Sequence, residues 1–129
     1  MKITLNGDQK KMFSWLLAGG LSVASAISSV VLISPSEGVK NVGYRDPVGI
    51  ATACYGHTGP DVKVGQWYSP SQCMEWLLKD SGKSEKDVDS VIHVPLNTYQ
   101  KAALISFDYN MGIGRLRSST MSKYFNNKD

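Results

Sequence analysis

An uncharged stretch of 22 residues, from Met12 to Ile33, constrains the fold of this chain more than any other feature. As a single helix it would be about 33 Å long, enough to cross the hydrocarbon core of a bilayer. The alternative is a buried core helix, but in a chain of 129 residues such a helix would normally have one polar face. Lys10 and Lys11 precede the stretch, and the next basic residue is Lys40. This asymmetry predicts a cytoplasmic N-terminus and export of the rest of the chain.

The sequence leaves open how this segment is processed. A cleaved signal peptide fits the basic start, the apolar run and the small residues Ala24-Ser25-Ala26. Against cleavage there, residues 27–33 continue the apolar character beyond the cut. Ten of the 22 residues are Gly, Ala or Ser, so an uncleaved segment would be a weak membrane anchor.

Charge separates the chain into unequal parts. Residues 1–33 carry three lysines and one aspartate, a net charge of +2, whereas residues 34–129 carry 11 basic and 10 acidic side chains, a net charge of +1. A nucleic-acid-binding surface needs clustered basic residues, so none is expected. We predict a cytoplasmic start (1–11), a membrane-spanning segment (12–33) and an exported domain (34–129).

The exported part has the signals of a small α+β domain. Two strand-like runs, 42–44 and 50–54, are joined by a turn that contains Asp46-Pro47 and Gly49. Helix starts follow at Ser69, Ser84 and Asn97. The helix from Asn97 is expected to be the longest, with an apolar stripe of Ala103, Phe107 and Met111.

The candidate catalytic residues are Glu37, Asp46 and Thr52, with the spacing Glu-x8-Asp-x5-Thr. Cleavage of a glycosidic bond needs one carboxylic acid that protonates the leaving oxygen, and a second carboxylate on the opposite side of the bond. A threonine hydroxyl beside the second carboxylate can both donate and accept, so it can orient water. The triplet therefore has the residue types of a glycosidase.

Cys54 and Cys73 are the only cysteines, and in an exported domain a disulfide between them is favoured. Free thiols are one alternative. A zinc site is the other, but Cys54, His57 and Cys73 make only three ligands and His93 is distant in the sequence. We expect no metal and no other cofactor. His57 follows a glycine in a tight turn, which favours a hydrogen-bonded structural residue over a proton carrier.

Three aromatic residues could stack on sugar rings. They are Trp67, Tyr68 and Trp76. For Trp76, core packing is the favoured role because Leu77 lies beside it in the helix from Ser69.

Two blocks of the chain resemble the phage-type lysozymes (glycoside hydrolase family 24), the muramidases that phages use as endolysins. The first block contains Glu37-Gly38, Tyr44-Arg45-Asp46, Gly49, Thr52 and residues 55–59. The second comprises residues 103–114 and Arg117-Ser118-Ser119-Thr120. The resemblance implies a lysozyme-like α+β fold, with a small β-hairpin lobe and a helical lobe.

The resemblance also implies a reaction. Glu37 would be the general acid, kept protonated by burial. Asp46 would stay ionised and, with Thr52, position water on the opposite face of the sugar. This arrangement predicts inversion and a separation of the two carboxyl groups of about 6.5–9.5 Å. The substrate would be the β-1,4 bond between N-acetylmuramic acid and N-acetylglucosamine in peptidoglycan, cleaved for lysis of the host cell.

For the uncharged segment, the resemblance favours signal-anchor-release. The uncleaved segment would be inserted by the Sec machinery into the bacterial inner membrane and would later escape to the periplasm, the protein being a monomer. A cleaved signal and a permanent anchor remain alternatives.

Family members continue for several tens of residues beyond Asp129, so C-terminal helices are expected to be missing. The alternative function is therefore a truncated prophage remnant, inserted in the membrane and catalytically inactive.

Overall fold

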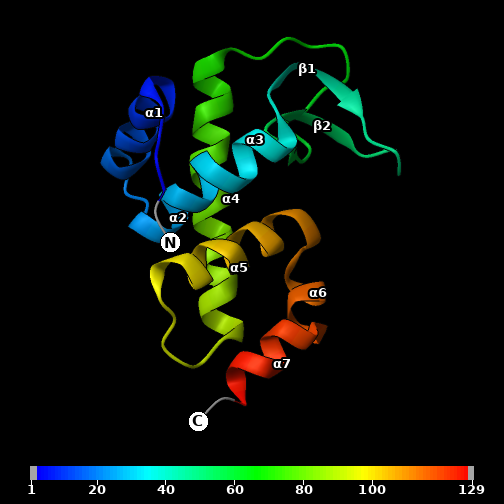
Figure 1. Ribbon diagram of the computed structural model, residues 1–129. Coiled ribbons are helices and arrows are strands. Elements are labelled where there is room, and N and C mark those ends of the chain that lie inside the picture. The colour runs from blue at the N-terminus through cyan, green and yellow to red at the C-terminus, as the bar shows by residue number, and fades with distance from the viewer. Residues whose placement is uncertain (1–2, 128–129) are drawn as a thin grey trace.

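The computed structural model describes residues 3–127, without the side chains of Ser36 and Glu37. A small sheet lobe and a helical lobe are joined by the long helix α4, Pro70–Val91. Figure 1 shows α4 running from the level of the sheet to the level of the last helices, with α5 crossing it. The expected α+β architecture is confirmed.

The sheet contains three antiparallel strands in the order β1-β2-β3, which are Lys40–Arg45, Ala51–Cys54 and His57–Thr58. Tyr44 lies opposite Thr52, and Thr52 lies opposite Thr58. The two predicted strands thus form the hairpin, and a short third strand follows the turn after β2. The polar side chain of Thr52 is placed in the middle of this sheet.

Helix α4 begins as predicted but does not end where expected. Ser69 is its N-cap and accepts a hydrogen bond from the backbone N–H of Gln72 at 3.1 Å. The prediction of a separate helix at Ser84 is wrong, because Ser84 lies within α4, a single helix of 22 residues. Ser84 is buried in the interior of α4, so tertiary packing outweighs its weak helix propensity.

Helix α5, Thr98–Met111, has the predicted start and a different buried face. Asn97 and Gln100 form a capping box, as their spacing indicates. With 14 residues α5 is not the longest helix. The predicted stripe is also wrong, because Ala103 is exposed and Met111 is 42% exposed. The buried positions are Ala102, Leu104, Ile105 and Asp108.

Two short helices, α6 (Ile113–Ser118) and α7 (Thr120–Asn126), complete the helical lobe. Leu116 is fully buried in the core with Leu104 and Ile105. The Asn126 side chain donates to the Val91 carbonyl at 2.7 Å and accepts from the His93 N–H at 2.8 Å. These bonds attach α7 to the end of α4.

Residues 12–33 do not form the predicted single helix in this structure. The segment is divided among α1 (Gly7–Ala18), α2 (Val23–Ile27) and the π-helix η1 (Ser28–Ile33), followed by α3 (Ser34–Glu37). Helix α1 ends at Gly19, and Gly20 has a φ of 102°, a conformation that interrupts a helix. Within residues 3–127, no helix has the length and apolar character needed to span a bilayer.

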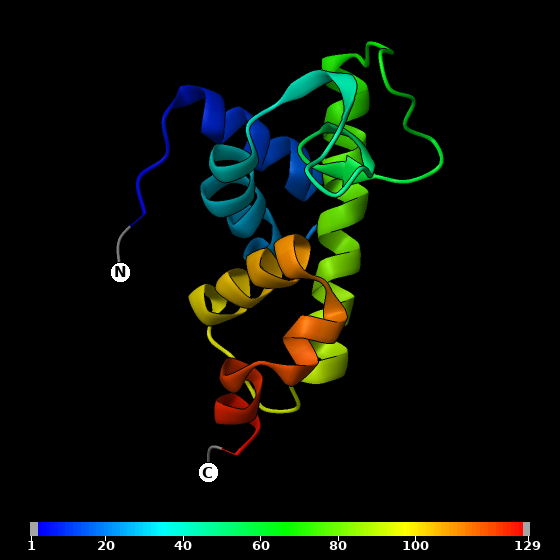
Figure 2. The ribbon, with the colours of Figure 1, turned by 90° about the vertical axis from the view of Figure 1, so that its right-hand side faces the viewer.

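The segment instead packs into the helical lobe. Leu16, Ala26 and Val30 are buried together, with Met74 and Leu78 of α4 against them. Figure 2 shows these N-terminal helices beside α4.

Serine side chains add hydrogen bonds to this interface. The Ser29 and Ser81 hydroxyls lie 2.7 Å apart, and Ser22 donates to the Glu85 carboxylate at 2.8–2.9 Å. The apolar segment thus forms part of the protein interior.

Candidate active site

Asp46 lies at the turn between β1 and β2, and the backbone of that turn holds its carboxylate. The N–H groups of Val48 and Ile50 both donate to Asp46 Oδ1 at 2.9 Å. The Asp46 N–H donates to the Ile50 carbonyl, also at 2.9 Å. These bonds hold the Asp46 carboxyl group in one orientation at the turn.

Thr52 is 4% exposed and lies in β2, close to the turn that carries Asp46. Its hydroxyl donates to the Ile50 carbonyl at 2.9 Å, which leaves the oxygen lone pairs available as acceptors. Ile50 thereby contacts both polar side chains through its backbone.

Asp46 and Thr52 line one cavity of about 380 Å³. The other lining residues come from the sheet, its turns and the end of α5, and they are Tyr44, Pro47, Gly56, Thr58, Tyr109 and Asn110. The cavity therefore lies between the two lobes, where a polymer could pass. Tyr109 is fixed at the edge of the sheet, since its hydroxyl donates to the Tyr55 carbonyl at 2.6 Å.

Glu37 is the last residue of α3, and its side chain lies outside the described part of the structure. The helix ends because Gly38 adopts a φ of 66°, and the Gly38 N–H closes the last turn on the Ser34 carbonyl at 2.9 Å. Strand β1 begins two residues later, at Lys40. The predicted separation of the Glu37 and Asp46 carboxyl groups stays a prediction.

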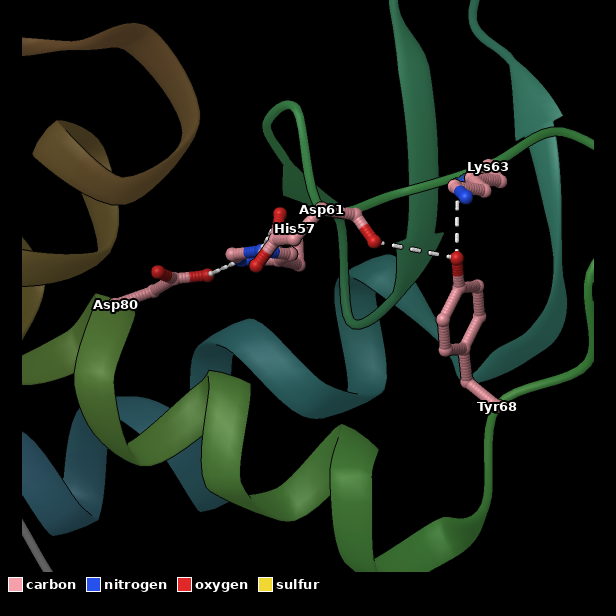
Figure 3. Close-up of polar contacts among 5 residues, drawn as sticks. All are labelled: His57, Asp61, Lys63, Tyr68 and Asp80. Carbon is pink, nitrogen blue, oxygen red and sulfur yellow. Dashed lines mark hydrogen bonds and ion pairs between the residues drawn. The ribbon is translucent and has the colours of Figure 1, made fainter.

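His57, the first residue of β3, is buried in a network between the sheet and α4 (Figure 3). Its Nδ1 lies 2.7 Å from Asp80 Oδ2 of α4, and its Nε2 lies 3.0 Å from Asp61 Oδ1. The ring stacks on Trp76 with 4.2 Å between centroids. These contacts attach the β2–β3 turn to α4.

The network also sets the protonation of His57. Burial alone lowers the pKa of His57, but the hydrogen bonds and charges of Asp80 and Asp61 outweigh it, and the pKa is raised above its ordinary value. The charged histidine thus stabilises the fold below the ordinary pKa, and this contribution is lost as the pH rises through the raised pKa.

The structure contains the predicted disulfide between Cys54 and Cys73, with the two Cα atoms 4.9 Å apart. It joins the end of β2 to the first turn of α4 and lies in the core of the sheet lobe. Both sulfurs that the zinc alternative requires are used in this bond. Among residues 3–127, no group of three or more His, Cys, Asp or Glu side chains could hold a metal ion.

The aromatic residues lie in contrasting surroundings. Trp76 is 8% exposed in the core, as expected, and Tyr68 is 7% exposed. Figure 3 shows the Tyr68 hydroxyl between Asp61 and Lys63, where it accepts from the Lys63 N–H at 2.7 Å. Trp67 is 61% exposed and alone among the three retains a large open face.

A second cavity, of about 270 Å³, adjoins the first, and sequence reasoning missed it. Both are lined by Gly56, Thr58 and Tyr109. Asp108 of α5 lines the second cavity, where burial and then the neighbouring Asp87 raise its pKa to about 7. The sequence signal that could have indicated this cavity was Asp108 itself, an acidic residue between Phe107 and Tyr109 in an apolar helix.

A small sheet lobe and a helical lobe with a cavity between them define the lysozyme-like class of proteins. Two solved structures have this fold. The muramidase domain of SpmX from Asticaccaulis excentricus is 28% identical, with a TM-score of 0.70, and the match covers 77% of this chain and 67% of that one. The active form of the P1 phage endolysin is 23% identical, with a TM-score of 0.71, over 84% of this chain and 61% of that one.

Residues 34–129 match the phage lysozyme family, and the chain belongs to that family. Similar proteins include the SAR-endolysins of Enterobacteria phages PA-2 and P21, each 35% identical over 93% of this chain and 74% of the relative. The SAR-endolysin of Escherichia phage Mu is 36% identical over 95% of this chain and 74% of its own length.

Proposed function

We propose that Glu37, Asp46 and Thr52 carry out the reaction of this chain, which as a phage-type endolysin is a muramidase that hydrolyses peptidoglycan for host lysis. The observation that supports this assignment best is that Asp46 and Thr52 line the same cavity between the lobes. Glu37, at the end of α3, is separated by two residues from the first residue of the strand that leads to Asp46.

In the proposed reaction, Glu37 protonates the oxygen of the β-1,4 bond between N-acetylmuramic acid and N-acetylglucosamine. Asp46, with Oδ1 held by two backbone N–H groups, accepts a proton from water, and Thr52 orients that water. Water attacks the face of the sugar opposite the leaving group, which inverts the configuration. A lytic transglycosylase needs the acid but no attacking water, so Asp46 and Thr52 favour hydrolysis.

Product analysis tests this reaction. Full-length chain digesting purified peptidoglycan should release fragments with a reducing N-acetylmuramic acid end, detected by mass spectrometry. Thr52→Val removes the hydroxyl and should slow release by at least tenfold, whereas Thr120→Val, at an exposed position, should not. Release of 1,6-anhydro ends would instead indicate a transglycosylase. Equal rates for Thr52→Val and Thr120→Val would remove Thr52 from the assignment.

We also propose that residues 12–33 act as a signal-anchor-release segment. The absence of basic residues between Lys11 and Lys40 supports an inner-membrane form with a cytoplasmic N-terminus, inserted by the Sec machinery. The SAR-endolysin relatives support the same reading. Leu16, Ala26 and Val30 cannot contact lipid and the helical lobe at once, so the two placements exclude each other. The packed form would act in the periplasm as a monomer.

Activity is then controlled by topology. Glu37 lies only four residues beyond Ile33, so an inserted segment would hold it at the bilayer surface, out of reach of long glycan strands. Escape of the segment would both free Glu37 and complete the core of the helical lobe.

A further inference from the structure

The second cavity lies between α4, the end of α5 and the β2–β3 turn, and its wall is acidic. Asp80, Asp87 and Asp108 line it together with Lys83. Lys83 Nζ pairs with Asp87 Oδ2 at 3.2 Å, but the lysine side chain is 74% exposed. Lys83 and the His57 that pairs with Asp80 offset part of the negative charge, and the wall keeps an excess of acceptor oxygens.

Asp108 supplies a buried atom without a partner in this wall. The residue is 3% exposed, and its carboxyl group contacts Asp87 and Ser84. Its Oδ1 atom is buried and has no hydrogen-bond partner among the described residues. An unpaired buried acceptor costs about 1–3 kcal/mol, and buried polar atoms are nearly always paired. A donor that enters the cavity would remove this cost.

The position of the cavity identifies the molecule that brings the donor. It shares Gly56, Thr58 and Tyr109 with the cavity that contains Asp46 and Thr52, so one substrate can occupy both. The sugars of peptidoglycan offer neutral hydroxyl and amide groups. The stem peptide attached to N-acetylmuramic acid carries a primary ammonium wherever it contains a diamino acid with a free amine. An ammonium has three donors, and its positive charge favours the ionised form of the Asp108 carboxyl group.

We propose that the cavity binds the side-chain ammonium of the peptidoglycan stem peptide, with Asp108 Oδ1 and Asp87 as acceptors. The proposal rests on the proposed function, because it takes the neighbouring cavity to hold the glycan. Asp80 is engaged by His57 and serves to shape the wall. The cavity thereby selects strands whose stem peptides keep a free amine.

Calorimetry with a product tests the proposal without turnover. The ligand is the disaccharide tetrapeptide that ends in N-acetylmuramic acid, which lacks the bond that a muramidase cleaves. Full-length chain should bind the form with a free diamino-acid amine about tenfold more tightly than the form in which that amine is acetylated. Asp108→Asn and Asp87→Asn should each reduce this preference to less than twofold. Asp89→Asn, on the exposed face of α4, is the matched control and should keep the preference.

Equal affinity of the parent chain for the two ligands would overturn the proposal, as would an unchanged preference in both cavity variants with native circular dichroism. Failure of the proposed function is a separate result, because it would appear as absence of peptidoglycan clearing by the parent chain. A preference for the free amine without clearing would preserve the ammonium site and reject the glycosidase assignment.

Discussion

At the scale of single residues, the fold changes the protonation of Asp108. Its pKa is raised from 3.8 to about 7, so the folded chain binds a proton that the unfolded chain has released. The penalty for ionising Asp108 is absent below about pH 4, grows as the pH rises, and is complete above about pH 7. The fold therefore contains a carboxyl group that weakens it in neutral and alkaline solution.

Asp108→Asn should remove this penalty, because an amide cannot ionise. We expect the free energy of unfolding at pH 8 to rise by roughly 2–4 kcal/mol relative to the parent, and by less than half as much at pH 5. Urea denaturation at both pH values measures the difference. The Asp89→Asn control should show no such dependence on pH. A variant that is equally affected at pH 5 and pH 8 would mean that Asp108 is not protonated in the folded chain.

At the scale of elements, the N-terminal segment packs into the helical lobe, and the proposed membrane-inserted form would remove it from there. Three residues of the segment test this proposal. A Cβ atom at Gly19 would lie 2.9 Å from a Leu78 methyl group, and Gly20 has a φ that a leucine would find strained. Ser22 bonds Glu85. Leucine at these positions weakens packing in the helical lobe and strengthens the membrane anchor.

The triple replacement Gly19→Leu, Gly20→Leu and Ser22→Leu should therefore keep the protein in the membrane fraction and suppress lysis. Cell fractionation and the lysis time course measure both effects. Val23→Leu adds apolar surface at an exposed position without disturbing these contacts, and should behave like the parent. A triple variant that lyses cells as fast as the parent would favour a cleaved signal peptide.

The disulfide connects two further elements, β2 and α4, across 19 residues of sequence. On the chain-entropy account, closing a loop of this size contributes about 3 kcal/mol. Protein recovered from the periplasm should show no free thiols before reduction, and reduction should lower its unfolding free energy by about that amount. Two titratable thiols on folded, unreduced protein would contradict the pairing.

The same elements explain what the sequence could predict. The hairpin, the capped starts of α4 and α5 and the Cys54–Cys73 pair follow from local turn and cap chemistry and from the single possible pairing of two cysteines. The uninterrupted course of α4 does not follow from local chemistry, because Ser84 is held in the helix by packing against other elements. Hydropathy also cannot distinguish lipid from a protein interior. Residues 12–33 are apolar enough for either environment, and only three-dimensional contacts such as Ser29–Ser81 show that the segment packs in the protein interior.

The candidate site was also only partly predictable from the sequence. The Glu-x8-Asp-x5-Thr spacing predicted a site that contains Asp46 and Thr52, and the hairpin does bring these two residues to one cavity. Their catalytic roles and that of Glu37 stay predictions. Two features of the cavities were not predictable in this way, namely the wall at Tyr109 and the second cavity lined by Asp87 and Asp108. Both depend on how α5 packs on α4. Such contacts between distant segments leave no local pattern.

At the scale of the whole molecule, both lobes contribute to the cavity that we propose as the substrate cleft. The sheet lobe supplies Asp46 and Thr52, and α5 of the helical lobe supplies Tyr109. The helical lobe takes part of its core from Leu16, Ala26 and Val30 of the N-terminal segment. Under the proposed signal-anchor-release, escape of that segment from the membrane would complete the helical lobe, so experiments on activity should use the full chain.

The most direct test of the account is the clearing of a peptidoglycan suspension by full-length chain and its Glu37→Gln variant. The amide keeps the size of the side chain and removes the proton that the leaving oxygen needs, so the clearing rate should fall by at least about a hundredfold. Circular dichroism should stay unchanged, and the exposed control Glu75→Gln should clear at the parental rate. A Glu37→Gln variant that clears within a few-fold of the parent would contradict the assignment of Glu37 as the catalytic acid.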